Sequence, residues 1–149
     1  MTITTEINKV SLKKIEGKNL SNRSKEQLAS CDIRLQKVVN LTLDFMDLVV
    51  IDGHREKKEQ DEYFKSGKSR LEWPKSKHNV MPSLAIDMAP VRNLIIPWEE
   101  VTLFYYFAGA VISCAKQIGV KLRWGGDWKG LHDFKKNEFN DLTHFEIRD

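Results

Sequence analysis

The sequence contains only two cysteines, Cys31 and Cys114, and no C-x-x-C pair. This excludes a disulfide-rich scaffold, a dithiol redox motif and a cysteine-based structural zinc site. Each cysteine lies in a segment whose composition is typical of a helix, where a small apolar side chain packs well. We therefore expect two buried free thiols.

Long hydrophobic runs are also missing. The charge-free stretch 101–115 is shorter than the roughly twenty residues that a membrane-spanning helix needs, so it predicts a buried core helix and a protein that is not embedded in a membrane. Residues 1–14 show no apolar run of signal-peptide length. Synthesis and folding in a cytoplasm are therefore expected.

An excess of one charge is lacking as well. The 24 basic and 21 acidic residues give a net charge of only +3, which does not indicate a nucleic-acid partner. Five basic residues do gather in the segment 65–77, namely Lys65, Lys68, Arg70, Lys75 and Lys77. They would attract an anionic polymer such as a cell wall, or they form an ordinary solvated loop.

No internal repeat and no Gly/Ser-rich or Pro-rich linker divides the 149 residues, of which 41% are hydrophobic. This predicts one domain, 1–149, with an irregular N-terminal arm at 1–22. Ser24 and Gln27 resemble a capping box for a short helix that ends near Ser30. A second helix is expected from Asp32, because its apolar face recurs every three or four residues, at Leu35, Val38, Val39, Thr42, Leu43 and Met46.

Strand and helix patterns alternate over the remaining chain. A β-branched run at 48–51 ends in an Asp-Gly turn, residues 55–66 have helical composition, and Pro97 suits the first turn of a helix that ends before Gly119. Further strands are predicted at 84–89, 120–124 and 143–147, and a loop at 68–82. The connections do not fit a repeating βαβ pattern, so we predict an α+β fold with a small, mainly antiparallel sheet.

Among the four histidines, His78 and His144 are the most plausible metal ligands. His78 ends the polar loop, and His144 lies in the last predicted strand. We interpret His54 as a surface or supporting residue of the turn after the first strand. His132 is a rival third ligand, although its surroundings have the composition of a loop.

Asp87 is an acidic residue inside an apolar strand. Its burial would be costly unless it were paired or bound to a metal, whereas simple strand alternation could instead point it to solvent. Together His78, Asp87 and His144 would provide the three protein ligands of a catalytic Zn²⁺ site. Asp141, three residues before His144, is then the local candidate for a general acid/base, and Arg55 for a cation that stabilises the oxyanion.

Several segments in order resemble the zinc D-Ala-D-Ala carboxypeptidase and L-alanyl-D-glutamate peptidase family, which includes many phage endolysins. The segments are VVIDGHREKKEQ, GKSR, SKHNVMPSLAID, RWGGDW and DLTHFEI, and the resemblance covers about residues 24–147. It implies a hedgehog/DD-peptidase-like fold with a zinc site at the sheet. It also implies that His78, Asp87 and His144 bind zinc, that Asp141 is the acid/base, that Arg55 and Gln60 orient the substrate, and that Ser76 lies on the substrate side.

Two departures from the family pattern stand out. The aspartate follows the histidine after nine residues rather than seven, with Met81, Pro82 and Ser83 in the gap, so the loop could alter the substrate cleft without moving the ligands. The acid/base position holds Asp141 where many carboxypeptidases have glutamate. This second departure favours the phage endopeptidase branch.

The resemblance implies an endolysin that hydrolyses the L-Ala-D-Glu bond of peptidoglycan stem peptides. The alternatives are a D,D-carboxypeptidase or dipeptidase, and a non-catalytic, zinc-stabilised wall-binding module. A monomer is expected, held in the host cytoplasm until a separate pore-forming protein lets it reach the cell wall.

Overall fold

The computed structural model of the protein describes residues 20–149, so most of the expected irregular arm lies outside the described residues. The described chain contains helices α2 (Asn22–Ala29), α3 (Ile33–Leu43), α4 (Lys57–Lys65) and α5 (Val101–Gln117). Its strands are β1 (Leu48–Asp52), β2 (Ala85–Pro90), β3 (Leu122–Gly125) and β4 (Asp141–Ile147). Two 3₁₀ turns, at Lys77–Asn79 and Phe134–Lys136, were not predicted.

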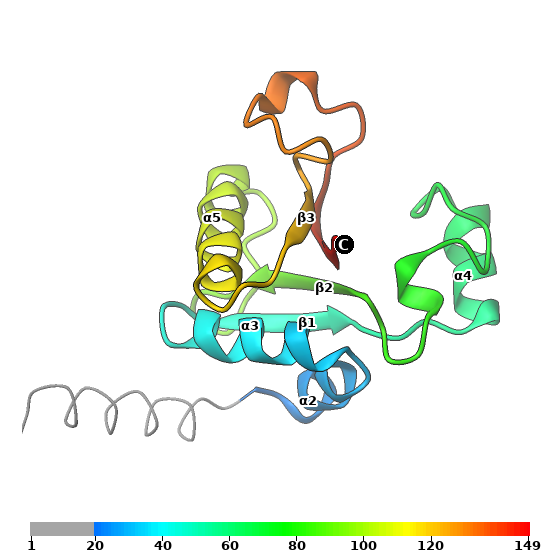
Figure 1. The fold of residues 1–149 in the computed structure, drawn as a ribbon, viewed down its shortest axis with the longest axis horizontal. Helices are drawn as coiled ribbons and strands as arrows, with labels where there is room; N and C mark the ends of the chain where they lie inside the picture. The colour runs from blue at the N-terminus through cyan, green and yellow to red at the C-terminus, as the bar shows by residue number, and fades with distance from the viewer. Residues whose placement is uncertain (1–19) are drawn as a thin grey trace, which may run out of the picture.

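The four strands form one sheet in the order β1-β2-β4-β3, and each neighbouring pair is antiparallel. Side chains of α3 and α5 share a core with Ile86, Met88 and Phe145 of the sheet. Helix α5 and the segment before it lie on one side of β3 and β4, and α4 with its following loop lies on the other (Figure 1). The predicted α+β fold with a small antiparallel sheet is thus confirmed.

The two N-terminal helices, α2 and α3, differ in how well the sequence predicts their bounds. The buried residues of α3 are Leu35, Val38, Val39, Thr42 and Leu43, as the spacing predicts, and Asp32 caps this helix. Helix α2 instead begins one turn earlier than predicted, because Ser21 is its N-cap and accepts a hydrogen bond from the Ser24 amide. Ser24 is buried, and its hydroxyl bonds the backbone of Val50, which ties α2 to β1.

Two further local predictions need correction. Cys31 does not lie in a helix but in the link between α2 and α3, where it forms an isolated bridge with Ser83. Both cysteines are nevertheless buried free thiols, and burial raises the pKa of Cys31 to about 12. Pro97 precedes α5 rather than entering its first turn, since its carbonyl accepts the amide of Glu100, the N-cap residue.

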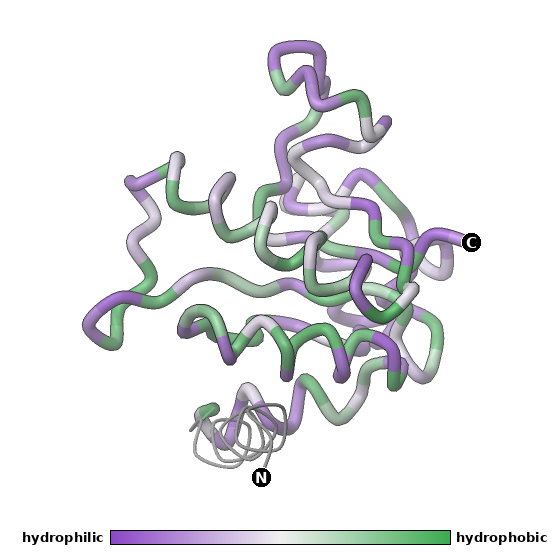
Figure 2. Tube along the Cα trace, turned by 60° about the vertical axis from the view of Figure 1, so that its left-hand side comes forward, coloured by the Kyte–Doolittle hydropathy of each residue, from purple (hydrophilic) through white to green (hydrophobic). Residues whose placement is uncertain are grey.

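No helix in residues 20–149 combines the length and the apolar character needed to cross a membrane. The loop 126–140, between β3 and β4, projects at the top of Figure 2 and is mainly hydrophilic. It stands away from the core and forms one wall of the cleft described below.

Gly53 follows β1 at a point where two backbone segments approach closely. A Cβ atom there would lie 2.3 Å from the Gln27 carbonyl oxygen and 2.4 Å from the Ser30 hydroxyl. We expect Gly53→Ala to lower the free energy of unfolding by about 1–3 kcal/mol, because backbone would have to move. Urea denaturation measures this change.

Gly109 provides the matched control, because a Cβ atom at this position in α5 meets nothing within 4 Å. Gly109→Ala should stabilise the protein by about 0.5–1 kcal/mol, the usual gain for glycine replaced by alanine in a helix. Equal stability of Gly53→Ala and the unmodified protein would contradict the close approach at Gly53.

Candidate metal centre and active-site cleft

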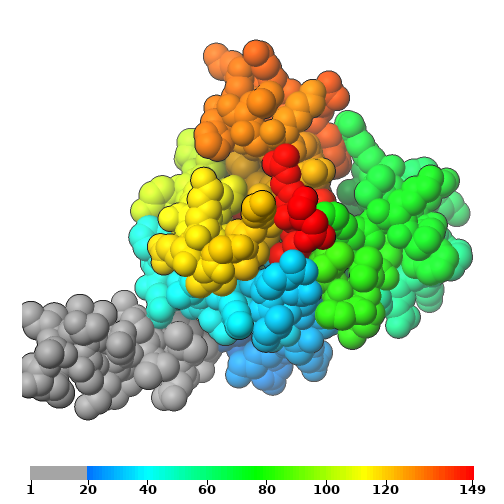
Figure 3. All heavy atoms as spheres, in the orientation of Figure 1, coloured from blue at the N-terminus to red at the C-terminus, as the bar shows by residue number. Residues whose placement is uncertain are grey.

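A cleft of about 780 Å³ opens over the sheet face that α3 and α5 leave uncovered. The segment after α4 contributes Ser69, Arg70 and Lys75, and the loop 126–140 contributes Trp128 and Phe139. In Figure 3 these two parts, green and orange, flank the C-terminal residues in red. The floor holds side chains from β2 and β4, which include Asp87 and His144.

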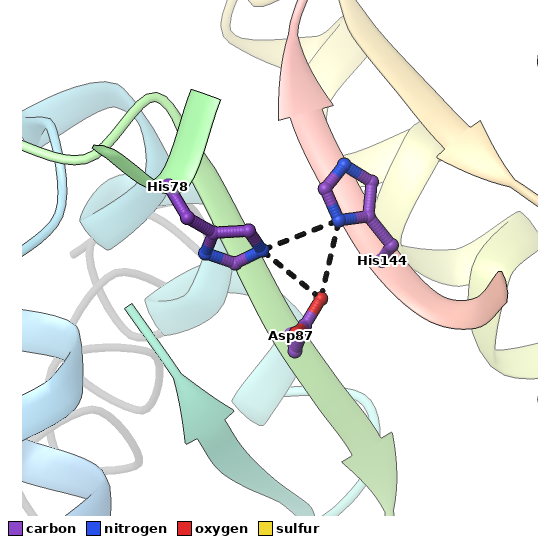
Figure 4. A group of neighbouring side chains, drawn as sticks. All are labelled: His78, Asp87 and His144. Atoms are coloured by element: carbon purple, nitrogen blue, oxygen red, sulfur yellow. Dashed lines mark hydrogen bonds and ion pairs between the residues drawn. The ribbon is translucent and has the colours of Figure 1, made fainter. Parts of the chain in front are cut away.

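Three side chains converge on this floor (Figure 4). Asp87 and His144 are directly paired residues of β2 and β4, and His78 comes from the 3₁₀ turn above them. His78 Nε2 lies 3.3 Å from His144 Nδ1 and 3.3 Å from Asp87 Oδ1, and His144 Nδ1 lies 3.2 Å from Asp87 Oδ1. The structure therefore brings together the three residues that the sequence suggested as ligands.

The spacing of these atoms fits a metal ion. Four ligands at tetrahedral angles, each about 2.0–2.1 Å from a zinc ion, lie roughly 3.3–3.4 Å from one another. The three observed separations are 3.2–3.3 Å, nearly an equilateral triangle. Two imidazoles and a carboxylate would leave a fourth position open toward the cleft, as in catalytic rather than structural sites.

His78 is held at its main-chain amide and at one nitrogen of its ring. The Ser76 hydroxyl caps the 3₁₀ turn and accepts the His78 amide at 3.2 Å, while His78 Nδ1 lies 2.7 Å from the Gly53 carbonyl oxygen. A carbonyl only accepts, so Nδ1 carries the hydrogen and Nε2 presents its lone pair to the cluster. The aspartate-glycine turn after β1 thus sets the tautomer of a candidate ligand.

His144 is oriented by a carboxylate, Glu146, for which the sequence patterns predict no role. Its Nε2 lies 2.9 Å from Glu146 Oε1, and Glu146 in turn pairs with Lys77 at 3.3 Å. Burial alone would lower the pKa of His144, but bonds to Asp87 and Glu146 raise it to about 9. A metal ion and a proton therefore compete for Nδ1.

A row of polar side chains crosses three strands on this face. Asp52 of β1 pairs with Asp87 of β2, which pairs with His144 of β4. Burial would raise the pKa of Asp87, but the facing His78 and His144 lower it well below its usual range. Asp87 thus lies on the cleft floor as a carboxylate with a side chain only 14% exposed, and the alternative that strand alternation points it to solvent is wrong.

Arg55 is buried against this row. Its Nε and Nη2 donate to Asp52 at 2.9 and 2.7 Å, Nη2 also donates to Asp87 at 3.3 Å, and Nη1 donates to Gln60 at 2.8 Å. The guanidinium also stacks on Tyr63, 4.2 Å from the ring centroid. Four of its five N–H groups are therefore engaged within the protein.

Gln60 lies behind Arg55 and does not reach the cleft. It is fully buried, and its amide oxygen accepts from Arg55 and Asn79. Its amide nitrogen donates to Ser69 and to the Leu71 carbonyl. Both polar atoms of the Gln60 amide are therefore engaged within the protein, which leaves neither for the substrate contact that the family resemblance implies.

Asp141 enters the cleft because β4 is irregular. Strand alternation puts residues three apart on opposite faces, yet Asp141 and His144 both line the cleft. Trp124 pairs with Phe145, but the next residue, Gly125, pairs with Asp141, so the register breaks between them. Burial, together with the charge of Asp87, raises the pKa of Asp141, as suits a group that must take up a proton.

The other histidines stand apart from the cluster. His132 is exposed, has a φ of 56° and does not line the cleft, which removes it as the rival ligand. His54 hydrogen-bonds the Val80 carbonyl through Nδ1 at 3.1 Å, in agreement with a supporting role in the turn. Trp128, which the sequence reading did not single out, packs 5.3 Å from the His144 ring.

Substitution of Glu146 tests whether its hydrogen bond to the His144 ring contributes to metal binding. We expect Glu146→Gln to weaken metal binding about 10- to 100-fold, because the amide cannot match the carboxylate as an acceptor for the imidazole N–H. Competition with a chromophoric chelator measures this affinity. Glu138→Gln, on the cleft wall, is the matched control and should bind metal as the unmodified protein does. Equal affinities of the two variants would contradict the assignment.

An antiparallel sheet that carries a histidine and an aspartate at the floor of a cleft, joined there by a second histidine from an adjacent turn and by a buried carboxylate, is typical of metal-dependent hydrolases. The comparison with known proteins agrees with this class. The chain belongs to the phage L-alanyl-D-glutamate peptidase family, whose sequence profile matches residues 17–148.

Individual relatives support the same assignment. The L-alanyl-D-glutamate peptidase of Escherichia phage T5 is 34% identical over 137 residues, which covers 88% of this chain and 96% of the relative. The crystal structure of the Serratia marcescens L-Ala D-Glu endopeptidase ChiX matches with a TM-score of 0.70 and 27% identity. That match covers 92% of this chain and 95% of the other.

Proposed function

We propose that this protein is a metal-dependent peptidoglycan peptidase of the endolysin type that hydrolyses the L-Ala-D-Glu bond of the stem peptide. The observation that carries this proposal is the near-equilateral cluster of His78, Asp87 and His144 on the cleft floor, with Asp141 in the same cleft. The names of the relatives point to the same bond.

His78, Asp87 and His144 would hold the metal ion, for which Zn²⁺ fits the ligand set. Bound there, the ion would act as a Lewis acid on the scissile carbonyl and lower the pKa of a bound water to about 7. Asp141 accepts a proton from the attacking water and returns it to the departing nitrogen of D-Glu. A carboxyl with a raised pKa suits both transfers.

Of the other expected site residues, Ser76 would contact the substrate, whereas Arg55 and Gln60 act by positioning other side chains. The Ser76 oxygen accepts the His78 amide, which leaves the hydroxyl hydrogen for a substrate carboxylate. Arg55 acts through Asp87, since it holds Oδ2 and leaves Oδ1 to face the histidines. Gln60 positions Arg55 and the segment 69–71.

The basic segment after α4 supports an anionic substrate. Of the five basic residues in the segment 65–77, four line the cleft, namely Lys68, Arg70, Lys75 and Lys77, and the fifth, Lys65, is the last residue of α4. The stem peptide carries a free carboxylate on the D-Glu residue next to the scissile bond. Attraction by this wall would therefore favour a peptide with acidic residues after the cleavage point.

We also propose that the chain is a single catalytic domain that acts as a monomer. By analogy with its phage relatives, it would stay in the host cytoplasm until a separate pore-forming protein gives it access to the wall. Size-exclusion chromatography with light scattering measures the molar mass in solution. A mass of twice that of the chain would contradict the proposed monomer.

Digestion of purified sacculi, with and without a chelator, tests the function. Mass spectrometry should reveal stem peptides that begin with D-Glu, and their release should stop when the metal is removed. Loss of terminal D-Ala would instead identify a D,D-carboxypeptidase. If the folded protein produced no new peptide termini in the sacculi, the wall-binding module would be the remaining alternative.

A further inference from the structure

A second hollow of about 210 Å³ lies at the start of β4, and we call it the aromatic recess. Its residues are Trp98, Phe104, Asn140, Asp141, Leu142 and Thr143. Trp98 is 58% exposed although it is a large aromatic residue, and one side of its indole stacks on Phe104, with ring centroids 5.6 Å apart at 20°. Phe104 itself is 2% exposed, so the tryptophan rests on a rigid base.

The aromatic recess shares a wall with the active-site cleft. Asn140, Asp141 and Thr143 line both hollows. Asp141 therefore stands between the metal-ligand cluster on one side and the exposed indole on the other. A substrate that continued past Asp141, across this shared wall, would meet Trp98.

The covalent structure of the proposed substrate places a sugar ring near the scissile bond. In peptidoglycan the L-Ala nitrogen is acylated by the lactyl group of an N-acetylated amino sugar. Only two residue-sized units, the alanine and the lactyl group, separate the scissile bond from the sugar ring, which amounts to about 7 Å at full extension. The sugar ring therefore lies close enough to the reacting atoms to contact a wall of the protein beside them.

The two ends of the cleft differ in chemistry. The segment after α4 brings basic side chains, which suit the carboxylates on the D-Glu side of the bond. The aromatic recess contains Phe104 of α5 and Trp98 from the segment before this helix. Figure 1 shows this part of the chain on the opposite side of β4 from the segment after α4. A sugar ring presents C–H groups with partial positive charge, and these pack favourably on the electron-rich face of an indole.

We propose that the aromatic recess binds the amino sugar to which the stem peptide is attached, with Trp98 as the stacking platform. This inference rests on the proposed function and fixes the direction of the substrate, with glycan toward Trp98 and acidic peptide toward the basic wall. The oxygen of the Asn140 amide accepts a hydrogen bond from Asn137, and its nitrogen, which has no acceptor among residues 20–149, can donate to an N-acetyl or hydroxyl oxygen.

The test compares two substrates that differ only in the sugar: a muramoyl tetrapeptide and the same tetrapeptide with a lactoyl group on its N-terminus, called the free peptide below. Trp98→Leu keeps an apolar cover on Phe104 but removes the flat ring. We expect it to lower kcat/KM about tenfold for the muramoyl substrate, mainly through KM, and less than twofold for the free peptide. Trp98→Phe should restore most of the difference.

Trp73→Leu is the matched control, because Trp73 is 41% exposed and lines neither hollow. It should leave the ratio between the two substrates as in the unmodified protein. An equal loss on both substrates in Trp98→Leu would overturn the sugar site, because it would show a structural effect on Asp141. Cleavage of neither substrate by the unmodified protein would overturn the proposed function, and the sugar site with it.

Discussion

Asp141→Asn should lower kcat by about 10²- to 10⁴-fold while the protein stays folded and still binds metal. Asparagine has nearly the same shape as aspartate but cannot accept the proton of the attacking water. Burial has already raised the pKa of this carboxyl, so the charge is not needed to stabilise the fold at this position. Kinetics on a stem-peptide substrate, together with metal analysis of the same sample, measures both properties.

Asp133→Asn is the matched control for this prediction. Asp133 also lines the cleft, but it pairs with Lys136 on the loop 126–140 and lies outside the ligand cluster. Its removal should change kcat by less than about threefold, because exposed pairs contribute little. If Asp141→Asn behaved like Asp133→Asn, another residue would have to serve as the acid/base.

His78→Ala and His144→Ala should each abolish stoichiometric metal binding and reduce turnover by at least about 10³-fold, because Lewis-acid stabilisation is worth several kcal/mol. Each substitution removes one corner of a three-ligand site whose other two ligands bind weakly alone. Plasma mass spectrometry of the purified proteins would report the metal content, and peptide hydrolysis the turnover.

His132→Ala tests the alternative ligand that the sequence left open. It should retain full metal content and activity, since His132 is exposed on the loop 126–140 and does not line the cleft. Metal loss in His132→Ala would contradict the arrangement of ligands described above. A fully active His144→Ala variant would contradict the metal-dependent mechanism altogether.

Much of the fold follows from short-range patterns in the sequence. The buried face of α3 recurs at helical spacing, and the apolar runs at β1 and β2 are bounded by turn residues, so their type and extent were predictable. The start of α2 was misplaced because two serines three residues apart could each cap it. The choice of Ser21 depends on Ser24 being needed at Val50, a contact distant in sequence.

The candidate site was predictable in its ligands but not in its supports. His78, Asp87 and His144 are unusual residue types for their local surroundings, whereas Asp52 and Glu146 look like ordinary strand-end residues. Their roles arise only when antiparallel pairing places Asp52 beside Asp87 and when the His144 ring turns toward Glu146. The engagement of Gln60 likewise depends on a loop that folds over it.

The long spacing between His78 and Asp87 has a simple structural outcome. Val80 and Met81 are exposed, and residues 79–86 do not line the cleft, so the additional length loops outward. Ser83 then rejoins the fold through backbone hydrogen bonds with Ser30 and Asp32. The prediction that the ligands keep their places is consistent with this path, while the cleft wall is built from other segments.

The hydrogen bonds that His78 and His144 make to Gly53 and Glu146 bear on metal removal and exchange. Gly53 and Glu146 hold both rings in the ligand geometry through contacts within the fold, unlike zinc fingers, which fold only around their metal. The stripped protein should therefore remain folded and accept a different divalent ion on simple dialysis. Cobalt exchanged in this way would give a coloured derivative whose visible spectrum reports coordination directly.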